Sequence, residues 1–157
     1  MAGNTTLRVI PLGGLGEIGR NMMVLEYGDD IIVVDVGLMF PEEEMLGVDL
    51  VIPDFSYLRE NREKLRAVFL THGHEDHVGA LPYFMREFNA PIYGARLTDG
   101  LIRVKLQEHR LLQGAETHVV VPGEVITAGV FEVEFFPVAH SIPDACGLII
   151  RTPLGPV

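Results

Sequence analysis

Positive charge is scarce in this sequence of 157 residues. Only 12 lysines and arginines stand against 22 aspartates and glutamates, so the formal net charge is −10 and the pI is near 4.9. This balance argues against the broad basic face that is typical of a nucleic-acid-binding domain. A polyanionic ligand would therefore have to be bound locally, or by a part of the protein outside these residues.

Cysteine and long apolar runs are scarce as well. The single cysteine, Cys146, excludes an internal disulfide and fits a reducing compartment, so we expect a cytoplasmic protein. No apolar run approaches the roughly 20 residues that a membrane span requires. The first residues do not combine a basic segment with an apolar one, so we expect no signal peptide and no membrane association.

The length is that of about one domain, and a hydrophobic content of 48% is enough for a core. Strand pairs come first, helices are interleaved in the middle, and strand pairs return at the end. This order predicts an α/β fold in which packed sheets have helices outside them. The predicted strands are 7–12, 22–27, 31–36, 67–71, 92–93, 117–121, 124–127, 130–137 and 147–152, and the predicted helices are 57–65, 78–88 and 97–108.

The most informative stretch is Thr-His-Gly-His-Glu-Asp-His at 71–77, directly after the apolar run 67–70. Imidazoles and carboxylates packed this closely are costly to bury without a counter-ion, and both are ligands suited to Zn²⁺. On extended backbone His72 and His74 point the same way and would share one metal. Asp76 and His77, past a bend, would face a second metal. We predict a metal site here, in preference to a polar loop that happens to contain histidines.

A competing motif precedes this stretch. The glycines at 14, 16 and 19 match the G-x-G-x-x-G dinucleotide fingerprint after a predicted strand, and Asp35 ends a later strand. The fingerprint needs a full helix before the next strand, however, and residues 20–27 are too few and themselves resemble a strand. The favoured alternative is a glycine-rich hairpin turn close to the metal site.

A second candidate for cation binding is the acidic stretch at 42–49, where oxygen ligands could hold a hard cation. A solvated acidic loop is the favoured alternative for it. For Cys146, which is followed by an apolar run, we expect a buried structural thiol.

The motif at 71–77 matches the H-x-H-x-D-H signature of metallo-β-lactamase-fold hydrolases. The whole chain resembles bacterial ribonuclease J, which belongs to the β-CASP branch of that fold. The segments that carry this resemblance are 12–21, 34–41, 51–55 and 140–144. It implies an αββα sandwich of the metallo-β-lactamase type, incomplete at the C-terminus.

The resemblance also implies roles for individual side chains. Asp35 and Asp76 are the implied catalytic residues: Asp35 orients the metal loop, and Asp76 also holds the nucleophile in position. For Asp35 alone the alternative is a strand-end residue that caps backbone amides, and for His140 alone it is a hydrogen-bonded core histidine. The implied metal ligands are His72, His74 and His140 for a first zinc, and Asp76 and His77 for a second.

The implied function is zinc-dependent hydrolysis of RNA phosphodiester bonds, with manganese as an alternative metal. Hydroxide held between two metals would attack phosphorus, either from a 5′-monophosphorylated end or internally, in rRNA processing and mRNA decay. The implied assembly is a homodimer or homotetramer of the full-length protein. The alternatives are a hydrolase of small thioesters or lactams, and a relative that binds without catalysis.

This sequence departs from the family pattern after residues 152–157. The family continues into a strand whose aspartate bridges the metals, and later into the β-CASP domain, a further histidine ligand and a C-terminal domain. We therefore expect residues 1–157 to be the N-terminal portion of a metallo-β-lactamase domain. Alone, they are expected to be poorly stable and to have little or no nuclease activity.

Overall fold

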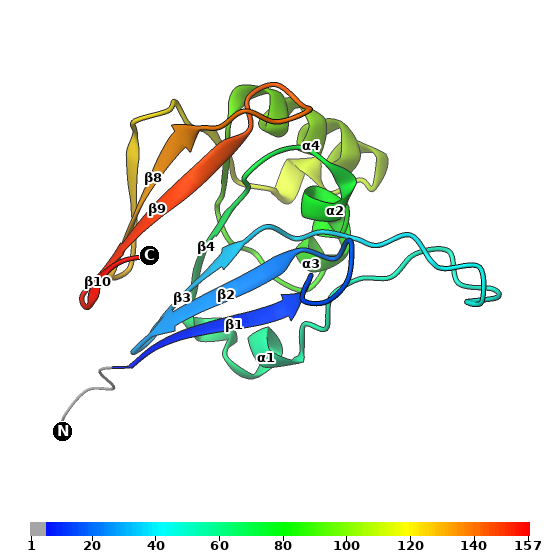
Figure 1. Cartoon of the computed structure of the whole chain (residues 1–157), viewed down its shortest axis with the longest axis horizontal. Helices are drawn as coiled ribbons and strands as arrows, with labels where there is room; N and C mark the ends of the chain where they lie inside the picture. The colour runs from blue at the N-terminus through cyan, green and yellow to red at the C-terminus, as the bar shows by residue number, and fades with distance from the viewer. Residues whose placement is uncertain (1–5) are drawn as a thin grey trace.

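Two β-sheets organise the chain in the computed structural model, which describes residues 6–157 (Figure 1). The first sheet has six strands, in the order β1 (Leu7–Gly13), β2 (Met22–Tyr27), β3 (Asp30–Val34), β4 (Leu65–Phe69), β5 (Ile92–Gly94) and β6 (Thr117–Val119). The second has four, in the order β10 (Gly155–Pro156), β9 (Cys146–Thr152), β8 (Phe131–Pro137) and β7 (Val125–Ala128). The predicted hairpin between 22–27 and 31–36 is present as β2 and β3.

Strand direction places the functional end of the first sheet. Strands β1, β2 and β3 pair antiparallel, whereas β3, β4, β5 and β6 run parallel. The carboxyl ends of β3 and β4 therefore lie at the same edge. Both strands are buried on both faces, and Ile31, Ile32 and Val33 have no exposed surface. This accounts for the almost unbroken β-branched run in β3.

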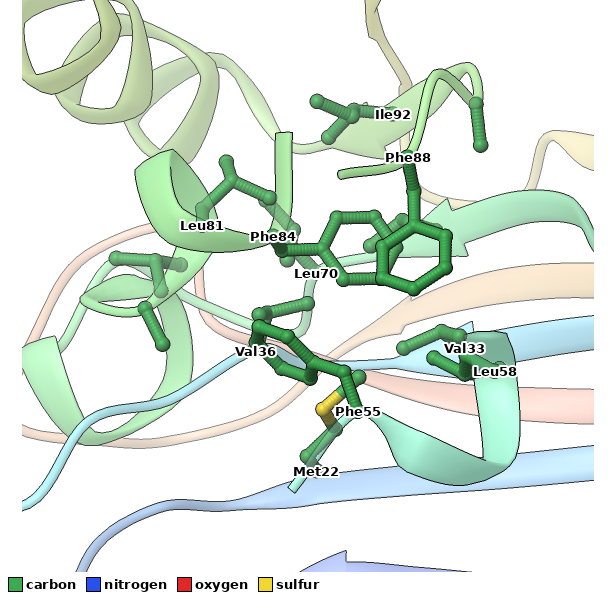
Figure 2. Packing of buried hydrophobic residues seen from close by; sticks show 14 of the residues in the cluster. Met22, Val33, Val36, Phe55, Leu58, Leu70, Leu81, Phe84, Phe88 and Ile92 are labelled. Atoms are coloured by element: carbon green, nitrogen blue, oxygen red, sulfur yellow. The ribbon is translucent and has the colours of Figure 1, made fainter. Parts of the chain in front are cut away.

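The helices cover one face of the six-stranded sheet (Figure 1). They are α1 (Ser56–Glu60), α2 (Glu75–Val78), α3 (Leu81–Met85) and α4 (Arg96–Glu108), with 3₁₀ turns at Arg62–Lys64 and Leu112–Gly114. Figure 2 shows the core that they form, where the ring of Phe55 meets those of Phe84 and Phe88 edge to face. No helix among residues 6–157 has the length and hydrophobicity that a membrane crossing requires.

The second sheet covers the opposite face. Along β8 the buried Phe131, Val133 and Phe135 alternate with residues that are partly or fully exposed. The ring of Phe135 lies against that of Phe69 on β4, with centroids 6.1 Å apart. Helices, first sheet and second sheet are thus three successive layers of the predicted αββα sandwich.

Two helix predictions need correction. The helix predicted at 78–88 is two short helices, α2 and α3, and the first begins at Glu75, inside the histidine motif. Pro82 has no N–H to continue the first helix, and the N–H of Ala80 donates to Val36 O, 3.0 Å away, instead of within the helix. The helix predicted at 57–65 ends at Glu60, and β4 already starts at Leu65.

Two neighbouring phenylalanines on β8 test this layer arrangement. Phe135→Ala should lower the free energy of unfolding by about 3 to 5 kcal/mol, because its ring is fully buried between the sheets. Phe136→Ala, on the same strand but 39% exposed, should cost much less. Urea denaturation of both variants measures the difference. Equal losses would contradict the assignment of the inner face.

Candidate metal centre

The predicted site residues meet where β3, β4 and β8 end. Asp35 directly follows β3, and the motif at 71–77 follows β4, so the parallel pairing of these strands brings them together. His140 lies in the loop between β8 and β9. The N–H of Cys146, at the start of β9, bonds to Thr71 O at 2.9 Å, which ties this loop to the motif. All six side chains proposed from the sequence are therefore at one end of the sandwich.

Three imidazoles form the first part of the site. The rings of His72 and His74 are 4.7 Å apart between centroids, and that of His140 is 4.6 Å from the first and 4.9 Å from the second. One nitrogen from each can be chosen so that all three lie within 4.8 Å of one another. His72 is buried, His74 is half-buried and His140 is exposed, so the cluster opens to solvent on the side of His140.

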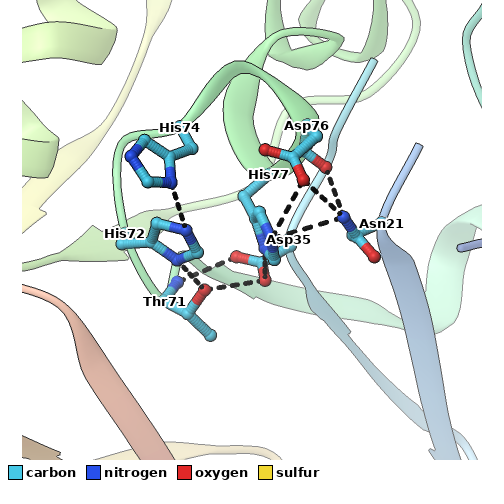
Figure 3. A network of polar contacts seen from close by, with 7 residues as sticks. All are labelled: Asn21, Asp35, Thr71, His72, His74, Asp76 and His77. Carbon is cyan, nitrogen blue, oxygen red and sulfur yellow. Dashed lines mark hydrogen bonds and ion pairs between the residues drawn. The ribbon is translucent and has the colours of Figure 1, made fainter. Parts of the chain in front are cut away.

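Asp76 and His77 form the second part, at the start of α2 (Figure 3). Asp76 Oδ2 and His77 Nε2 are 3.5 Å apart. The ring of His77 is also 4.0 Å from that of His72 between centroids, so the two parts adjoin. The motif thus divides its side chains between two neighbouring positions, as its spacing predicts.

Asp35 joins the two ends of the motif. Its Oδ1 accepts the Thr71 N–H at 2.8 Å, and its Oδ2 accepts the Thr71 hydroxyl at 2.8 Å. The same Oδ2 lies 2.7 Å from Nδ1 of His77 (Figure 3). Asp35 is buried and has a φ of 59°, a left-handed conformation that is uncommon outside glycine. Its carboxylate supports the loop, and its own backbone N–H bonds to Phe69 O.

Backbone pairing fixes the second half of the motif. The N–H groups of Val36 and Leu38 donate to the carbonyl oxygens of His77 and Glu75 at 2.8 and 3.0 Å. Between them Gly37 lies so close to the motif that a Cβ there would be 1.7 Å from Asp76 O. Only glycine permits this approach.

Burial and neighbouring charges separate the pKa values of two histidines. Burial first, and then the positive charge of His77, lower the pKa of His72 from 6.5 to about 4. Burial also disfavours the charged form of His77, but its hydrogen bond to Asp35 and the charges of Asp35 and Asp76 outweigh burial and raise its pKa. His72 is consequently a neutral imidazole at physiological pH, the form that coordinates metal.

The donor set fits a divalent metal. Three imidazole nitrogens are the ligands of many zinc sites, and Zn–N distances of about 2.0–2.1 Å are within reach of a cluster this tight. An imidazole and a carboxylate beside it offer a second position. Metal-bound histidines commonly donate a hydrogen bond from the N–H of their other ring nitrogen to a carboxylate, and Asp35 is placed to accept such a bond from His77.

The competing motifs do not form sites of their own. The glycine-rich segment is the hairpin turn between the antiparallel strands β1 and β2, with no helix after it, so the dinucleotide interpretation is wrong and its alternative is confirmed. Glycines 14, 16 and 19 have positive φ, as this turn requires. Within residues 6–157, the only group of three or more side chains that could hold a metal ion is that of His72, His74 and His140. This group does not include the acidic stretch at 42–49. Cys146 is buried, as expected.

Three contributors were not assigned roles from the sequence. Thr71 links Asp35 to the ring of His72, whose Nδ1 is 2.9 Å from its hydroxyl. Asn21 donates to the backbone carbonyl of Asp76, and Gly37 permits the close approach of the two segments. Both belong to segments that carry the family resemblance, but their roles depend on pairing between segments distant in sequence.

Comparisons with known proteins agree with this fold. The sequence model of the metallo-beta-lactamase superfamily matches residues 15–156, so the chain belongs to that superfamily. More particularly, it is 49% identical to ribonuclease J of Synechocystis sp. over 100% of its own length, and 44% identical to ribonuclease J 2 of Staphylococcus aureus over 98%. It spans 25% and 28% of those two proteins. The resemblance to ribonuclease J is confirmed.

Solved structures show the same fold. A protein of unknown function from Enterococcus faecalis superimposes with a TM-score of 0.72 at 23% identity, over 96% of this chain and 42% of its own. The metallo-beta-lactamase fold protein YhfI from Bacillus subtilis gives 0.64 at 22% identity, over 92% of this chain and 57% of its own. The predicted fold class is confirmed.

Gly37→Ala tests the close approach to Asp76. The added methyl group has no space beside the Asp76 carbonyl, so the variant should lose at least about 2 kcal/mol of stability and shift the NMR signals of His77. Gly100→Ala is the matched control. Gly100 lies within α4, where a Cβ meets nothing within 4 Å, so alanine should stabilise the chain by up to about 1 kcal/mol. Losses of equal size would contradict the packing of Gly37.

The lowered pKa of His72 predicts a pH dependence for the metal-free chain. As the pH falls from 6.5 towards 4, the unfolded chain protonates this histidine and the folded chain does not, so His72 reduces stability over that interval. The imidazole NMR signals of His72 should titrate with a midpoint near 4, and in His72→Gln the stability should decline less over the interval. A midpoint near 6.5 would refute the environment described for this ring.

Proposed function

We propose that this chain forms the metal-binding part of a ribonuclease related to ribonuclease J, which hydrolyses RNA phosphodiester bonds. The observation that carries the proposal is the cluster of His72, His74 and His140 beside Asp76 and His77. It occurs in a chain that is 49% identical over its whole length to a protein named for ribonuclease activity.

Zinc is the proposed metal, with manganese as the alternative. The ligands would form two groups, one for each metal ion. His72, His74 and His140 would hold one ion, while Asp76 and His77 would contribute to a second. When bound, the metals would supply Lewis-acid activation of water and charge stabilisation at the phosphoryl oxygens. The pairing of imidazole with carboxylate suits such borderline divalent ions.

The residues of this chain would act mainly by positioning. Asp35 holds the Nδ1 proton of neutral His77 and so leaves Nε2 with a free lone pair for coordination. The pairing of residues 36–38 with 75–77 keeps Asp76 in place during turnover. A site assembled in advance in this way does not reorganise when charge develops on phosphorus.

The charge of the chain argues that metal binding and RNA binding are functions of different domains. With a net charge of −10 the chain repels polyanions, so most of the electrostatic affinity for RNA would come from other domains. The curated relatives are about four times longer, which leaves room for such domains. We propose that residues 1–157 supply metal chemistry, that a β-CASP domain supplies RNA binding, and that the chain alone has little or no nuclease activity.

A chimera tests this function while allowing for an inactive isolated chain. Residues 1–157 would replace the matching segment of the Synechocystis ribonuclease J, to which they are 49% identical. The chimera should degrade 5′-monophosphorylated RNA in a metal-dependent manner. His72→Ala and Asp76→Ala should each reduce that rate by at least about 100-fold, since each removes a proposed metal ligand.

His109→Ala is the matched control, since His109 directly follows α4, contacts Tyr83 and Arg86, and is not among the clustered histidines. It should keep the rate of the unmodified chimera. A folded chimera without activity on RNA would contradict the proposed function. A chimera with His72→Ala that cleaves RNA as fast as the control would also contradict it.

A further inference from the structure

Asn21 has no role in the function proposed so far, yet its side chain contacts both members of the second metal position. It stands between the glycine-rich turn and β2. Its Nδ2 donates to Asp76 O at 3.0 Å and to Asp76 Oδ2 at 3.1 Å, and it lies 3.3 Å from His77 Nε2 (Figure 3). One amide group therefore faces both Asp76 Oδ2 and His77 Nε2, the two atoms that would coordinate the second cation.

The backbone of Asn21 is fixed on both sides. Its N–H donates to Asp76 O at 3.0 Å, and its carbonyl accepts the Gly37 N–H at 2.9 Å. These bonds connect the turn before β2, the segment after β3 and the start of α2. The side chain of Asp76 is itself 40% exposed, so the hydrogen bond from the amide to Oδ2 is a contact that holds its carboxylate towards His77.

The donor and acceptor pattern is consistent. In neutral His77 the proton lies on Nδ1, which faces the carboxylate of Asp35 at 2.7 Å. Nε2 then carries a lone pair and accepts from the amide of Asn21. Asp76 Oδ2 is a second acceptor 3.5 Å away. Two ligand atoms on a tetrahedral zinc lie roughly 3.3 Å apart, given Zn–N and Zn–O lengths near 2.0 Å.

We propose that Asn21 is a positioning residue for the second metal, whose amide holds Asp76 and His77 at coordinating separation before the ion binds. The inference rests on the proposed metal pair. His77 Nε2 would give up its contact with the amide when it coordinates, and this would cost little because that contact is the longest of the three. The bonds to Asp76 O do not compete with the ion, so they would persist and hold the backbone of Asp76. A carboxylate oxygen has more than one lone pair, so Oδ2 could coordinate while it still accepts from the amide, and that bond orients the carboxylate.

The test adds zinc stepwise to the metal-free ribonuclease J chimera described above, which restores the ligands expected outside residues 1–157, and follows the imidazole NMR signals of His74 and His77 separately. Asn21→Leu keeps the size of the side chain and the backbone bonds but removes the donor. It should weaken binding as reported by His77 about tenfold or more, the range for residues that orient metal ligands, and leave binding at His74 unchanged. The control is Asn61→Leu, which removes an amide that donates to Tyr57 O at 2.9 Å in α1; both affinities should stay unchanged.

Three results would overturn the inference. Unchanged binding at His77 in Asn21→Leu would show that the amide contributes only bulk. Equal weakening at His74 and His77, with a lower melting temperature, would show a general role in folding. An unmodified chimera in which zinc moves the signals of His74 but never those of His77 would show that the second metal position does not exist. The proposed function itself would be rejected only if zinc moved the signals of neither histidine in the unmodified chimera.

Discussion

The carboxylate of Asp35 is the constraint on which the rest of the site depends. One oxygen fixes the start of the histidine motif through the Thr71 N–H, and the other fixes its end through His77. Asp35 occupies a left-handed conformation that costs about 1 kcal/mol or more for a residue with a side chain. Three polar contacts offset that cost, and the conformation turns the chain so that residues 36–38 pair with 75–77. Without a buried acceptor at this point, the two proposed metal positions would have no fixed distance between them.

The sheets make that constraint possible. Because β3 and β4 are parallel neighbours buried on both faces, the residues that follow them are held at one edge by the hydrophobic core. The second sheet then brings His140 from about 70 residues further along the chain to the same edge, in agreement with ligand binding at the carboxyl ends of strands. The helices on the opposite face carry no proposed ligand except at the start of α2. The ionisable groups are unevenly distributed as well. The chain as a whole is acidic, whereas its imidazoles are concentrated at this edge.

Much of this arrangement was predictable because its determinants are local. The spacing in 71–77 predicts two metal positions, and the hairpin and the buried strands follow from composition. His140 was assigned as a ligand through the family resemblance; its place after the predicted strand at 130–137 fits a site at strand ends but does not by itself mark a ligand. The break between α2 and α3 was missed because it depends on Ala80 donating to Val36, a contact between distant segments. Gly37 and Asn21 lie in segments that carry the family resemblance. Their roles could not be predicted, because they depend on contacts between segments distant in sequence, which hydrophobic periodicity does not reveal.

Anomalous X-ray diffraction at the zinc absorption edge, from crystals of the zinc-loaded chain, tests the central claim most directly. A peak should lie among His72, His74 and His140, with one nitrogen of each about 2.0–2.1 Å away. A well-ordered site in which zinc binds elsewhere, or in which His140 turns away while the other two coordinate, would contradict the account.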